Sequence, residues 1–245
     1  MNYIIKDIDK ETALDMIQKY HYSNTLPRLN KHYLGFFIGE ELVGIVTLGY
    51  GTRPKHTIQK LFPSLDTKNY LEIGRMCMTE EMPRNSESQM LSQLIKWIKY
   101  NLPQIKILFT WADGMLGKVG YVYQASNFLY AGYSETDMYL IDGIKIHPRQ
   151  TKKLFGLEND KRVTVRPTLE QMKQFNINQY RGRQFKYLFF LCSKTEKKRL
   201  IRECTTPLTI KYPKEDDLKW KVRGTISKKL IDSDKPDYIT DICKK

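Results

Sequence analysis

The chain has 245 residues and a mass of 29.0 kDa, which is enough for one large domain or two small ones. With 41% hydrophobic and 28% charged residues, the composition excludes a fibrous or wholly disordered protein. Lys and Arg number 41 against 27 Asp and Glu, so the net charge of +14 favours a polyanionic partner, either nucleic acid or an anionic membrane.

The basic excess is concentrated in the C-terminal part of the chain. Residues 1–150 carry 17 basic and 15 acidic side chains, whereas residues 151–245 carry 24 and 12. We therefore expect a near-neutral catalytic domain at residues 1–145 and a basic extension at residues 146–245 that contacts a polyanion. A solvated basic surface that serves only solubility is the alternative explanation.

Cysteine usage and hydropathy indicate the compartment. The four cysteines, Cys77, Cys192, Cys204 and Cys243, form no C-x-x-C pair, which argues against a zinc knuckle and favours free thiols. The N-terminus has no apolar signal-peptide core, and no apolar run approaches the roughly 20 residues that span a bilayer. We expect a cytoplasmic protein that does not bind membranes.

Apolar periodicity predicts alternating helices and strands up to residue 141. In chain order these are a helix at 12–20, a hairpin at 33–38 and 42–48, a strand at 71–78, a helix at 86–100, a strand at 105–112, a helix at 121–126 and a hairpin at 129–133 and 138–141. Ser86 and Gln89 fit a capping box at the start of the helix at 86–100. The order predicts a mixed sheet with helices on its faces.

The chain changes character after residue 143. A short helix is expected at 168–175, an aromatic-rich strand at 185–192 and a basic helix at 195–203. The highly charged tail from residue 213 onward is expected to be loosely ordered.

Four residues form the first candidate site. His21 and Tyr22 follow the first helix, Asp113 ends an apolar strand, and Tyr123 lies on the helix after it. A carboxylate, a phenol and an imidazole at the end of a central strand can move protons or bind a metal. Each also has an ordinary structural explanation: a cation at a helix C-terminus for His21, a turn cap for Asp113 and a core position for Tyr123.

The segment between the strand at 71–78 and the helix at 86–100 is a second candidate. Unpaired backbone amides at the helix start, together with Arg84, make this turn a candidate anion cradle. It contains no glycine, so it is neither a P-loop nor a dinucleotide fingerprint, and an ordinary helix start remains the alternative.

The order of elements resembles the GNAT acetyltransferase fold. The resemblance implies an α/β (α+β) fold with a mixed, mostly antiparallel central sheet flanked by helices, followed here by the basic C-terminal extension. The run G-x-x-G-Y-x-Y-Q-A-S-N-F at residues 117–128 is similar to the fourth-helix signature of that fold. The resemblance implies that the strand–helix turn binds the pyrophosphate of coenzyme A, or of a related donor such as acetyl-CoA. The residues that this implies are Met78, Arg84, Asn85, Ser86, Glu87 and Ser88. The turn lacks the glycines usual in GNAT proteins, which argues against ordinary coenzyme A use.

A narrower resemblance is to the phage Mom proteins, GNAT-derived enzymes that modify adenine in DNA. It covers roughly residues 10–142 and rests on four motifs: H-Y-S at 21–23, L-E-I-G-R at 71–75, W-A-D-G at 111–114 and G-x-x-Y-x-A-x-x-F around 120–128. It implies that His21, Tyr22, Asp113 and Tyr123 are the critical residues. An iron requirement has been proposed for the family, which makes His21 and Asp113 candidate metal ligands.

The Mom resemblance implies a product and a partner. The exocyclic amine of adenine gains an acetamido (methylcarbamoyl) group, which masks phage DNA from host restriction enzymes in the host cytoplasm. A base in duplex DNA must be flipped out to be modified. The side chains expected to hold double-stranded DNA are basic residues interleaved with aromatic ones, namely Arg181, Arg183, Lys186, Lys194, Lys197, Lys198 and Arg199. The oligomeric state stays open, a homodimer included.

Two other functions remain open at this stage. An ordinary GNAT N-acetyltransferase would act on a small amine or a protein, but the basic C-terminal region argues against a purely small-molecule substrate. A non-catalytic DNA-binding protein would keep the fold without the reaction. In that case Asp113 and Tyr123 would be dispensable.

Overall fold

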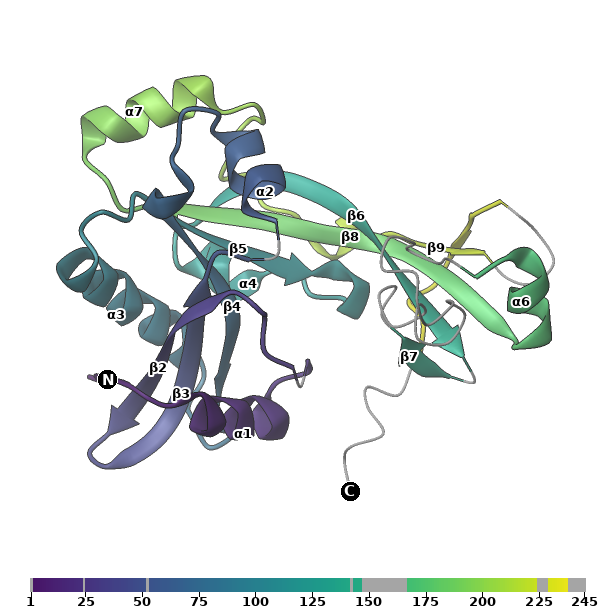
Figure 1. Cartoon of the computed structure of the whole chain (residues 1–245), viewed down its shortest axis with the longest axis horizontal. Coiled ribbons are helices and arrows are strands. Elements are labelled where there is room, and N and C mark those ends of the chain that lie inside the picture. The colour runs from purple at the N-terminus through teal and green to yellow at the C-terminus, as the bar shows by residue number, and fades with distance from the viewer. Residues whose placement is uncertain are drawn as a thin grey trace, which may run out of the picture. The chain divides into compact units, whose positions relative to one another are not determined.

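The computed structural model describes residues 2–23, 25–51, 53–141, 143–146, 167–223 and 229–237. The chain divides into two compact units. Unit 1 comprises residues 1–112, 120–132 and 186–212, and unit 2 comprises residues 113–119, 133–185 and 213–245. Two long strands, β6 (Leu129–Ile141) and β8 (Ile177–Phe190), contribute residues to both units (Figure 1).

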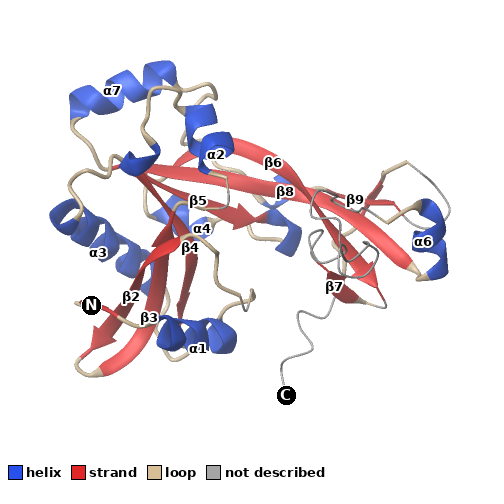
Figure 2. Ribbon diagram, viewed as in Figure 1, coloured by secondary structure: helices blue, strands red, loops and turns tan. Residues whose placement is uncertain are grey.

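Unit 1 is built on a mixed sheet with the strand order β1-β2-β3-β4-β5-β8. The antiparallel part consists of β1 (Ile4–Asp7), β2 (Asn30–Ile38), β3 (Glu41–Gly49) and β4 (Tyr70–Met78). β4 then pairs in parallel with β5 (Ile107–Asp113), and the paired residues run from Tyr70–Ile107 to Glu72–Phe109. The expected α/β fold with a mostly antiparallel sheet flanked by helices is confirmed (Figure 2).

Helices cover both faces of this sheet. α1 (Lys10–Tyr20) buries Ile17 against Ile45 of β3, whereas a side chain at the neighbouring Gly44 would meet Met90 of α3 (Ser86–Asn101). Successive residues of a strand point to opposite faces, so α1 and α3 lie on opposite sides of the sheet. We refer to these sides as the α1 face and the α3 face.

A bulge in β4 shifts the alternation of its side chains. Thr47 pairs with Arg75 and Leu48 pairs with Ile73, so Gly74 is an extra residue in β4. A side chain at Gly74 would come within 2.7 Å of Pro27, which explains why glycine stands there. Because of the bulge, Arg75 and Glu72 both point to the α1 face although they are three residues apart.

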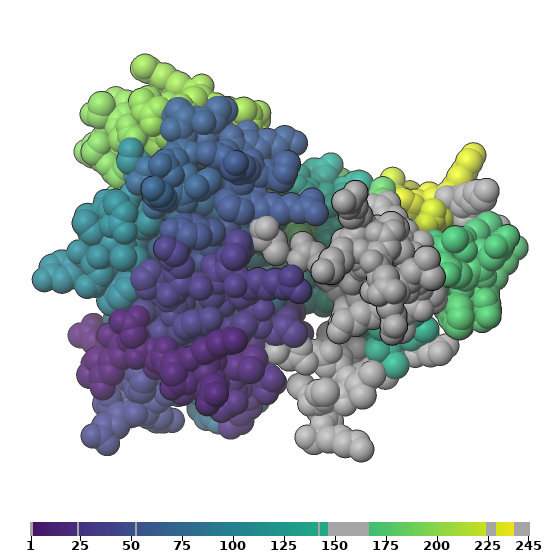
Figure 3. Space-filling model, in the orientation of Figure 1, coloured from purple at the N-terminus to yellow at the C-terminus, as the bar shows by residue number. Residues whose placement is uncertain are grey.

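The α1 face continues into an apolar cluster of unit 1. α2 (Pro54–Leu61) and α7 (Lys194–Glu203) lie side by side (Figure 3). Both helices contribute to this apolar cluster with β5 and β8. Arg199 of α7 donates to Ser64, which follows α2, and Glu203 accepts from the same hydroxyl. The buried members of the cluster come from all these segments: Ile58, Leu61, Phe62, Leu65, Tyr70, Ile107, Phe109, Ala131, Leu188, Phe190 and Leu200.

Unit 2 is a smaller mixed assembly around β6 and β8. β7 (Ile144–Ile146) pairs with β6, and β9 (Trp220–Arg223) pairs with β8 and with β10 (Ile231–Ser233). α6 (Leu169–Gln174) begins with a capping box formed by Thr168 and Gln171. Two short 3-10 turns, Gly114–Leu116 and Glu215–Asp217, complete the described part of unit 2.

Several expected elements differ in detail. The hairpin expected at 129–133 and 138–141 is wrong, because residues 129–141 form one strand, β6, and the hairpin partner is β7. The capping box expected at Ser86 and Gln89 is also wrong: the cap position is Asn85, and the Ser86 hydroxyl donates to the carbonyl of Pro83. The tail expected to be loose contains β9 and β10.

The two compact units do not coincide with the near-neutral and basic parts of the sequence. Residues 186–212, which the sequence assigns to a basic extension, belong to unit 1 together with most of the N-terminal half. Unit 1 carries 21 basic and 13 acidic residues and unit 2 carries 20 and 14, so both units are positive. The division into a catalytic part at 1–145 and a DNA-contacting part at 146–245 stays a prediction about function.

Two further expectations concern thiols and membranes. Cys77, Cys192 and Cys204 are free thiols, and Cys243 lies outside the described residues. Within the described ranges, no helix is long and apolar enough to cross a bilayer.

Replacing Leu200 with Ala tests the role of α7 in the core of unit 1. Leu200 is fully buried, so we expect a loss of about 2–5 kcal/mol in the free energy of unfolding, measured by urea denaturation. The adjacent Ile201 is 40% exposed, and Ile201→Ala should change stability by no more than about 0.5 kcal/mol. Equal losses in the two variants would contradict the placement of α7.

Candidate active site

His21 ends α1 and begins a short loop on the α1 face. Its backbone amide donates to Ile17, and its ring stacks on Tyr22 with 4.2 Å between the ring centroids. The Nδ1 atom lies 2.9 Å from the Ser23 amide nitrogen and 3.0 Å from the Ser23 carbonyl oxygen. A neutral ring can accept from the amide at Nδ1 and a charged ring can donate there to the carbonyl, so either protonation state has a partner.

Arg75 of β4 fastens this loop to the sheet. Its guanidinium donates to the Ser23 hydroxyl at 2.9 Å and to the Thr25 carbonyl at 2.9 Å, as well as to the carbonyl of Gly74. The H-Y-S and L-E-I-G-R motifs, which lie far apart in sequence, are therefore in direct contact. Tyr22 remains 39% exposed beside them.

Tyr123 lies on the opposite side of the sheet. It belongs to α4 (Tyr121–Ala125), and its ring packs against Phe128 and Tyr187 at centroid distances of 5.6 and 5.5 Å. Burial raises the pKa of its hydroxyl, and a hydrogen bond with Thr110 of β5 opposes that shift. The phenol is thus held neutral and can act as a proton donor.

Gly120 allows α4 to approach the sheet closely. It has a φ of +90°, and a side chain there would lie 2.7 Å from the ring of Tyr187 and 2.9 Å from Ala112. Only glycine combines this backbone conformation with such a close contact. The G-x-x-Y motif therefore has a structural basis in the packing of Tyr123.

Asp113 caps the turn that follows β5. Its carboxylate accepts from the Met115 amide at 3.1 Å, which is the turn-capping role that the sequence left open. Asp113 belongs to unit 2, whereas His21, Tyr22 and Tyr123 belong to unit 1. The structure joins His21 and Tyr22 to each other and places Tyr123 on the other face of the sheet of unit 1.

The turn before α3 forms an open pocket of about 320 Å³. Met78, Arg84, Ser86 and Glu87 line it, together with Thr79, Glu80, Met82 and Pro83. Asn85 has a left-handed φ of 71° and provides no side-chain cap for α3, while Ser88 donates to the carbonyl of Asn85. The first amides of α3 are not capped by the side chain of Asn85, and such amides attract anions.

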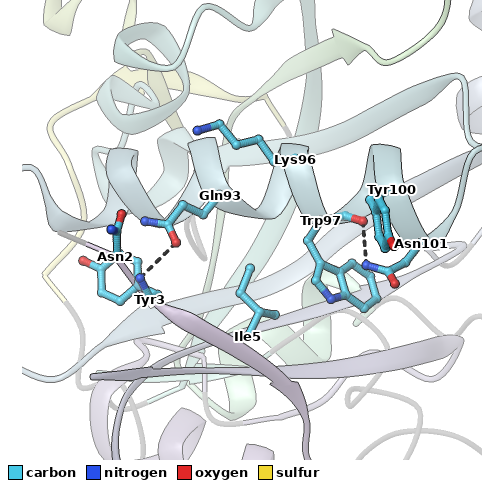
Figure 4. A pocket seen from close by; sticks show the side chains of 8 residues that line it. All are labelled: Asn2, Tyr3, Ile5, Gln93, Lys96, Trp97, Tyr100 and Asn101. Carbon is cyan, nitrogen blue, oxygen red and sulfur yellow. Dashed lines mark hydrogen bonds between the residues drawn. The ribbon is translucent and has the colours of Figure 1, made fainter. Parts of the chain in front are cut away.

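A larger hollow of about 420 Å³ lies between β1 and α3 (Figure 4). Tyr3, Gln93, Trp97 and Tyr100 line it with Asn2, Ile5, Lys96 and Asn101. The Gln93 side chain accepts from the Tyr3 amide at 2.9 Å. None of the residues that the sequence predicts to be functional lines this hollow.

Sequence reasoning missed Glu72, which lies within the L-E-I-G-R strand. Its carboxyl group is partly buried on the α1 face, and desolvation raises its pKa to about 7, although the Trp111 indole N–H and the charge of Arg75 lower it. A side chain at Gly51 would collide with this carboxylate. An acidic residue among the apolar residues at the start of this strand was the available signal.

The predicted DNA-binding side chains fall into two groups: arginines that already interact with carboxylate or carbonyl oxygens, and lysines that do not form ion pairs among the described residues. Arg181 forms a bidentate ion pair with Asp137, and Arg199 pairs with Glu196 and Glu203. Arg183 donates to the Asp217 carbonyl and lies 4.3 Å from the centre of the Tyr133 ring. Lys194, Lys197 and Lys198 are exposed on α7, while Lys186 is half-buried on β8.

Metal ligation is not supported by the described residues. Among them, no group of three or more His, Cys, Asp and Glu side chains is arranged to hold a metal ion. His21 and Asp113 lie in different units.

Comparison with known proteins now identifies the family. A family model described as the Mom protein family matches residues 2–214. The chain belongs to the Mom protein family. It is 33% identical over 205 residues to the methylcarbamoylase Mom of Escherichia phage Mu, which is 82% of each chain.

Solved structures with similar folds are acetyltransferases. A Bacillus subtilis acetyltransferase in complex with CoA has a TM-score of 0.42 and 11% identity and covers 78% of this chain and 100% of its own. An N-acetyltransferase from Staphylococcus aureus Mu50 has the same TM-score, 15% identity and the same coverage. TM-scores below 0.5 support no conclusion about donor or substrate.

Glu72 makes the stability of this Mom protein depend on pH. Its pKa is about 7 in the folded protein against an ordinary 4.5, so between these values the unfolded state binds fewer protons than the folded one. The free energy of unfolding should therefore fall by about 3 kcal/mol as the pH rises from about 4.5 to 7, and this contribution should stay constant above that. Denaturant titrations of wild type and Glu72→Gln at each pH measure the difference.

The control is Glu41→Gln, which changes an exposed carboxylate on β3. This variant should keep the wild-type dependence on pH, whereas Glu72→Gln should lack the drop assigned to Glu72. If wild type and Glu72→Gln lose stability in parallel over this range, Glu72 does not have a raised pKa.

Proposed function

We propose that this Mom-family protein is a transferase that adds a methylcarbamoyl group to the exocyclic amine of adenine in DNA and so protects phage DNA from restriction. The observation that carries the proposal is the 33% identity to the methylcarbamoylase Mom over 82% of both chains. The amine forms one N–C bond to the methylene carbon of the –CH2–CO–NH2 group and loses one proton, while the donor loses its bond between that carbon and a leaving group. The enzyme must therefore bind a base, bind a carbon donor and move a proton.

The donor is proposed to bind at the turn before α3. An acyl-CoA-related donor carries a pyrophosphate, and the pocket combines Arg84 with the uncapped amides of α3. Met78, Asn85, Ser86, Glu87 and Ser88 are the other residues proposed to contact it. The absence of glycine in this turn means that side chains, rather than a bare backbone loop, must make much of the contact.

The two faces of the sheet suggest how donor and base would meet. β4 and β5 pair only as far as Glu72 and Phe109, and each strand continues beyond that point. Tyr123 on the α3 face is proposed to donate a proton to the leaving group of the donor. His21 and Tyr22 on the α1 face are proposed to position the base, with Asp113 completing the catalytic set.

An N-acetyltransferase acting on a small amine or a protein is the second candidate. It would use the same donor pocket and proton donor but a different amine. The product of the reaction distinguishes the two candidates directly.

Nucleoside analysis tests the proposed function. DNA from cells that express the protein is digested to nucleosides, and mass spectrometry should detect a deoxyadenosine with the added methylcarbamoyl mass. Tyr123→Phe and Asp113→Asn should abolish the product while leaving DNA affinity within about threefold, because phosphate contacts dominate that affinity. Tyr121→Phe, a change at an exposed tyrosine on the same helix, is the matched control and should retain activity.

Unmodified deoxyadenosine with soluble protein would contradict the proposal, and acetylated amines or peptides would favour the second candidate. A purified reaction with acetyl-CoA as the only added donor tests the donor separately. Acyl transfer from its thioester would release the CoA thiol and leave an N6-acetyl group, whereas the methylcarbamoyl product has a methylene carbon on N6 and a carboxamide nitrogen that acetyl-CoA lacks. Only the methylcarbamoyl mass in a reaction with another donor would match the proposed reaction. Activity in both Tyr123→Phe and Asp113→Asn would exclude the proposed catalytic set.

The dependence of DNA affinity on salt concentration tests whether the basic residues of α7 bind the phosphates of double-stranded DNA. Each phosphate neutralised contributes about 0.9 to the slope of log affinity against log salt, so Lys198→Gln should reduce the slope by about that amount. Arg199→Gln on the same helix should reduce it less, because Arg199 is already paired with Glu196 and Glu203. A slope that is flat in wild type would exclude a phosphate-binding role for α7.

A further inference from the structure

Trp111 of β5 lies between two charged groups that the proposed catalytic set does not use. Its indole N–H forms a hydrogen bond with the Glu72 carboxyl group, and the ammonium of Lys186 lies 5.9 Å from the centre of its ring. Glu72 and Lys186 both point to the α1 face, as do Trp111 and the residues of the apolar cluster. All three residues belong to unit 1.

Glu72 is a carboxyl group that forms no ion pair within 4 Å with any residue in the described ranges. Its charged neighbour is Arg75, whose guanidinium donates to Ser23, Thr25 and Gly74. Tyr70 is the other titratable neighbour on the same strand, and its hydroxyl donates to the Tyr50 carbonyl. The Trp111 N–H occupies one acceptor position of this partly buried carboxyl group, and a carboxyl group has further positions that a ligand can use.

Lys186 is the opposite case, a half-buried ammonium. Burial lowers its pKa, and the nearby charge of Lys60 on α2 lowers it further. In the part of the chain that the structure describes, neither lysine forms an ion pair. Lys60 itself is exposed, so the pair consists of one half-buried ammonium and one solvated ammonium of the same charge, and an anion bound beside Lys186 would offset their repulsion.

Glu72 and Lys186 do not neutralise each other. No ion pair within 4 Å joins these two described residues, and Trp111 interacts with both of them. A ligand that satisfies both must carry a hydrogen-bonding edge at one end and an anion at the other, with an apolar or aromatic middle. A nucleotide has this arrangement, with its base edge, its sugar and its phosphate.

We propose that the α1 face around Trp111 binds the flipped-out adenine nucleotide, with Glu72 pairing to the base edge and Lys186 and Lys60 holding a flanking phosphate. This inference rests on the proposed function and names the place where its substrate is read. It assigns specificity to Glu72, a role distinct from that proposed for His21, Tyr22, Asp113 and Tyr123.

The edge of adenine explains why a carboxyl group suits this position. Adenine presents a donor at N6 and an acceptor at N1 or N7, and a neutral carboxyl group offers an acceptor and a donor in matching positions. Desolvation at Glu72 favours this neutral form near pH 7. Gln offers the same pair of groups without a charge, whereas Met has about the same length but offers neither.

The neighbouring residues restrict how the carboxyl group can lie. Gly51, with a φ of +63°, leaves no room for a side chain next to Glu72. Tyr50 precedes Gly51, and the ammonium of Lys31 lies 4.8 Å from the centre of the Tyr50 ring. Lys31 is therefore a third cation near the proposed site. These contacts place aromatic rings and lysines together, as proteins that bind unpaired nucleotides do.

Binding to two DNA duplexes tests the site without relying on catalysis. One duplex carries a single adenine opposite an abasic position, and the other is abasic at both positions. The ratio of their dissociation constants measures what the unpaired base contributes. We expect a ratio of at least about tenfold for wild type and for Glu72→Gln, and less than about threefold for Glu72→Met and Trp111→Ala.

Lys186→Gln tests the phosphate half without disturbing the base edge. It should weaken binding to both duplexes alike and lower the salt slope by about 0.9. Glu41→Gln and Lys68→Gln alter exposed charges on β3 and next to β4, and they serve as matched controls that should behave as wild type. Circular dichroism of each variant confirms that it is folded before binding is measured.

Each outcome decides between the alternatives. A wild-type ratio near one, or an unchanged ratio in Glu72→Met, overturns the inference. If the ratio of dissociation constants falls below about threefold in Glu72→Gln as well, the site requires a charged carboxylate. That result also overturns the proposal that Glu72 recognises the adenine edge. If the ratios follow the expectation but cells yield no modified deoxyadenosine, the nucleotide site stands and the proposed function fails. If deoxyadenosine is modified equally by wild type and Glu72→Met, the function stands and the inference fails.

Discussion

The extra residue that β4 inserts at Gly74 determines which side of the sheet each side chain of that strand reaches. Without this bulge, Arg75 and Glu72 would point to opposite faces, because they are an odd number of residues apart. With it, Arg75 holds the loop of His21 and Tyr22 on the face where Glu72 meets Trp111. Glycine is required at the bulge because Pro27 lies too close for a side chain.

The same strand separates two kinds of chemistry. On the α3 face, Tyr123 is packed among aromatic rings and held neutral, near the helix whose first turn lines an anion-sized pocket. On the α1 face, Glu72 and Lys186 present groups that no described residue neutralises. β4 and β5 pair only as far as Glu72 and Phe109. The proposed meeting of donor and base between the two faces depends on this short pairing.

Local pattern predicted the fold well wherever one face of an element is apolar. α3 and the β2–β3 hairpin follow directly from the spacing of their buried side chains. The break expected within β6 failed because its polar middle is stabilised by a partner distant in sequence: Arg181 of β8 pairs with Asp137 there. The same pairing explains why a count of basic residues does not identify free cations, since Arg181 and Arg199 are engaged by carboxylates. For the site, motifs located His21 and Tyr123, but the environment of Glu72 comes from Gly51 and Trp111, which no local pattern joins to it.

β8 enters the sheet of unit 1 late during synthesis. The apolar side chains Ile107 and Phe109 of β5 are covered in part by Leu188 and Leu200, which are translated much later. At roughly 5–20 residues per second, the ribosome exposes this half-finished sheet for several seconds before its last strand and α7 emerge. The core of unit 1 therefore cannot close during early translation. The nascent chain should need protection by chaperones over that interval. Unit 1 can fold only after β8 and α7, which are encoded late in the gene, have been translated.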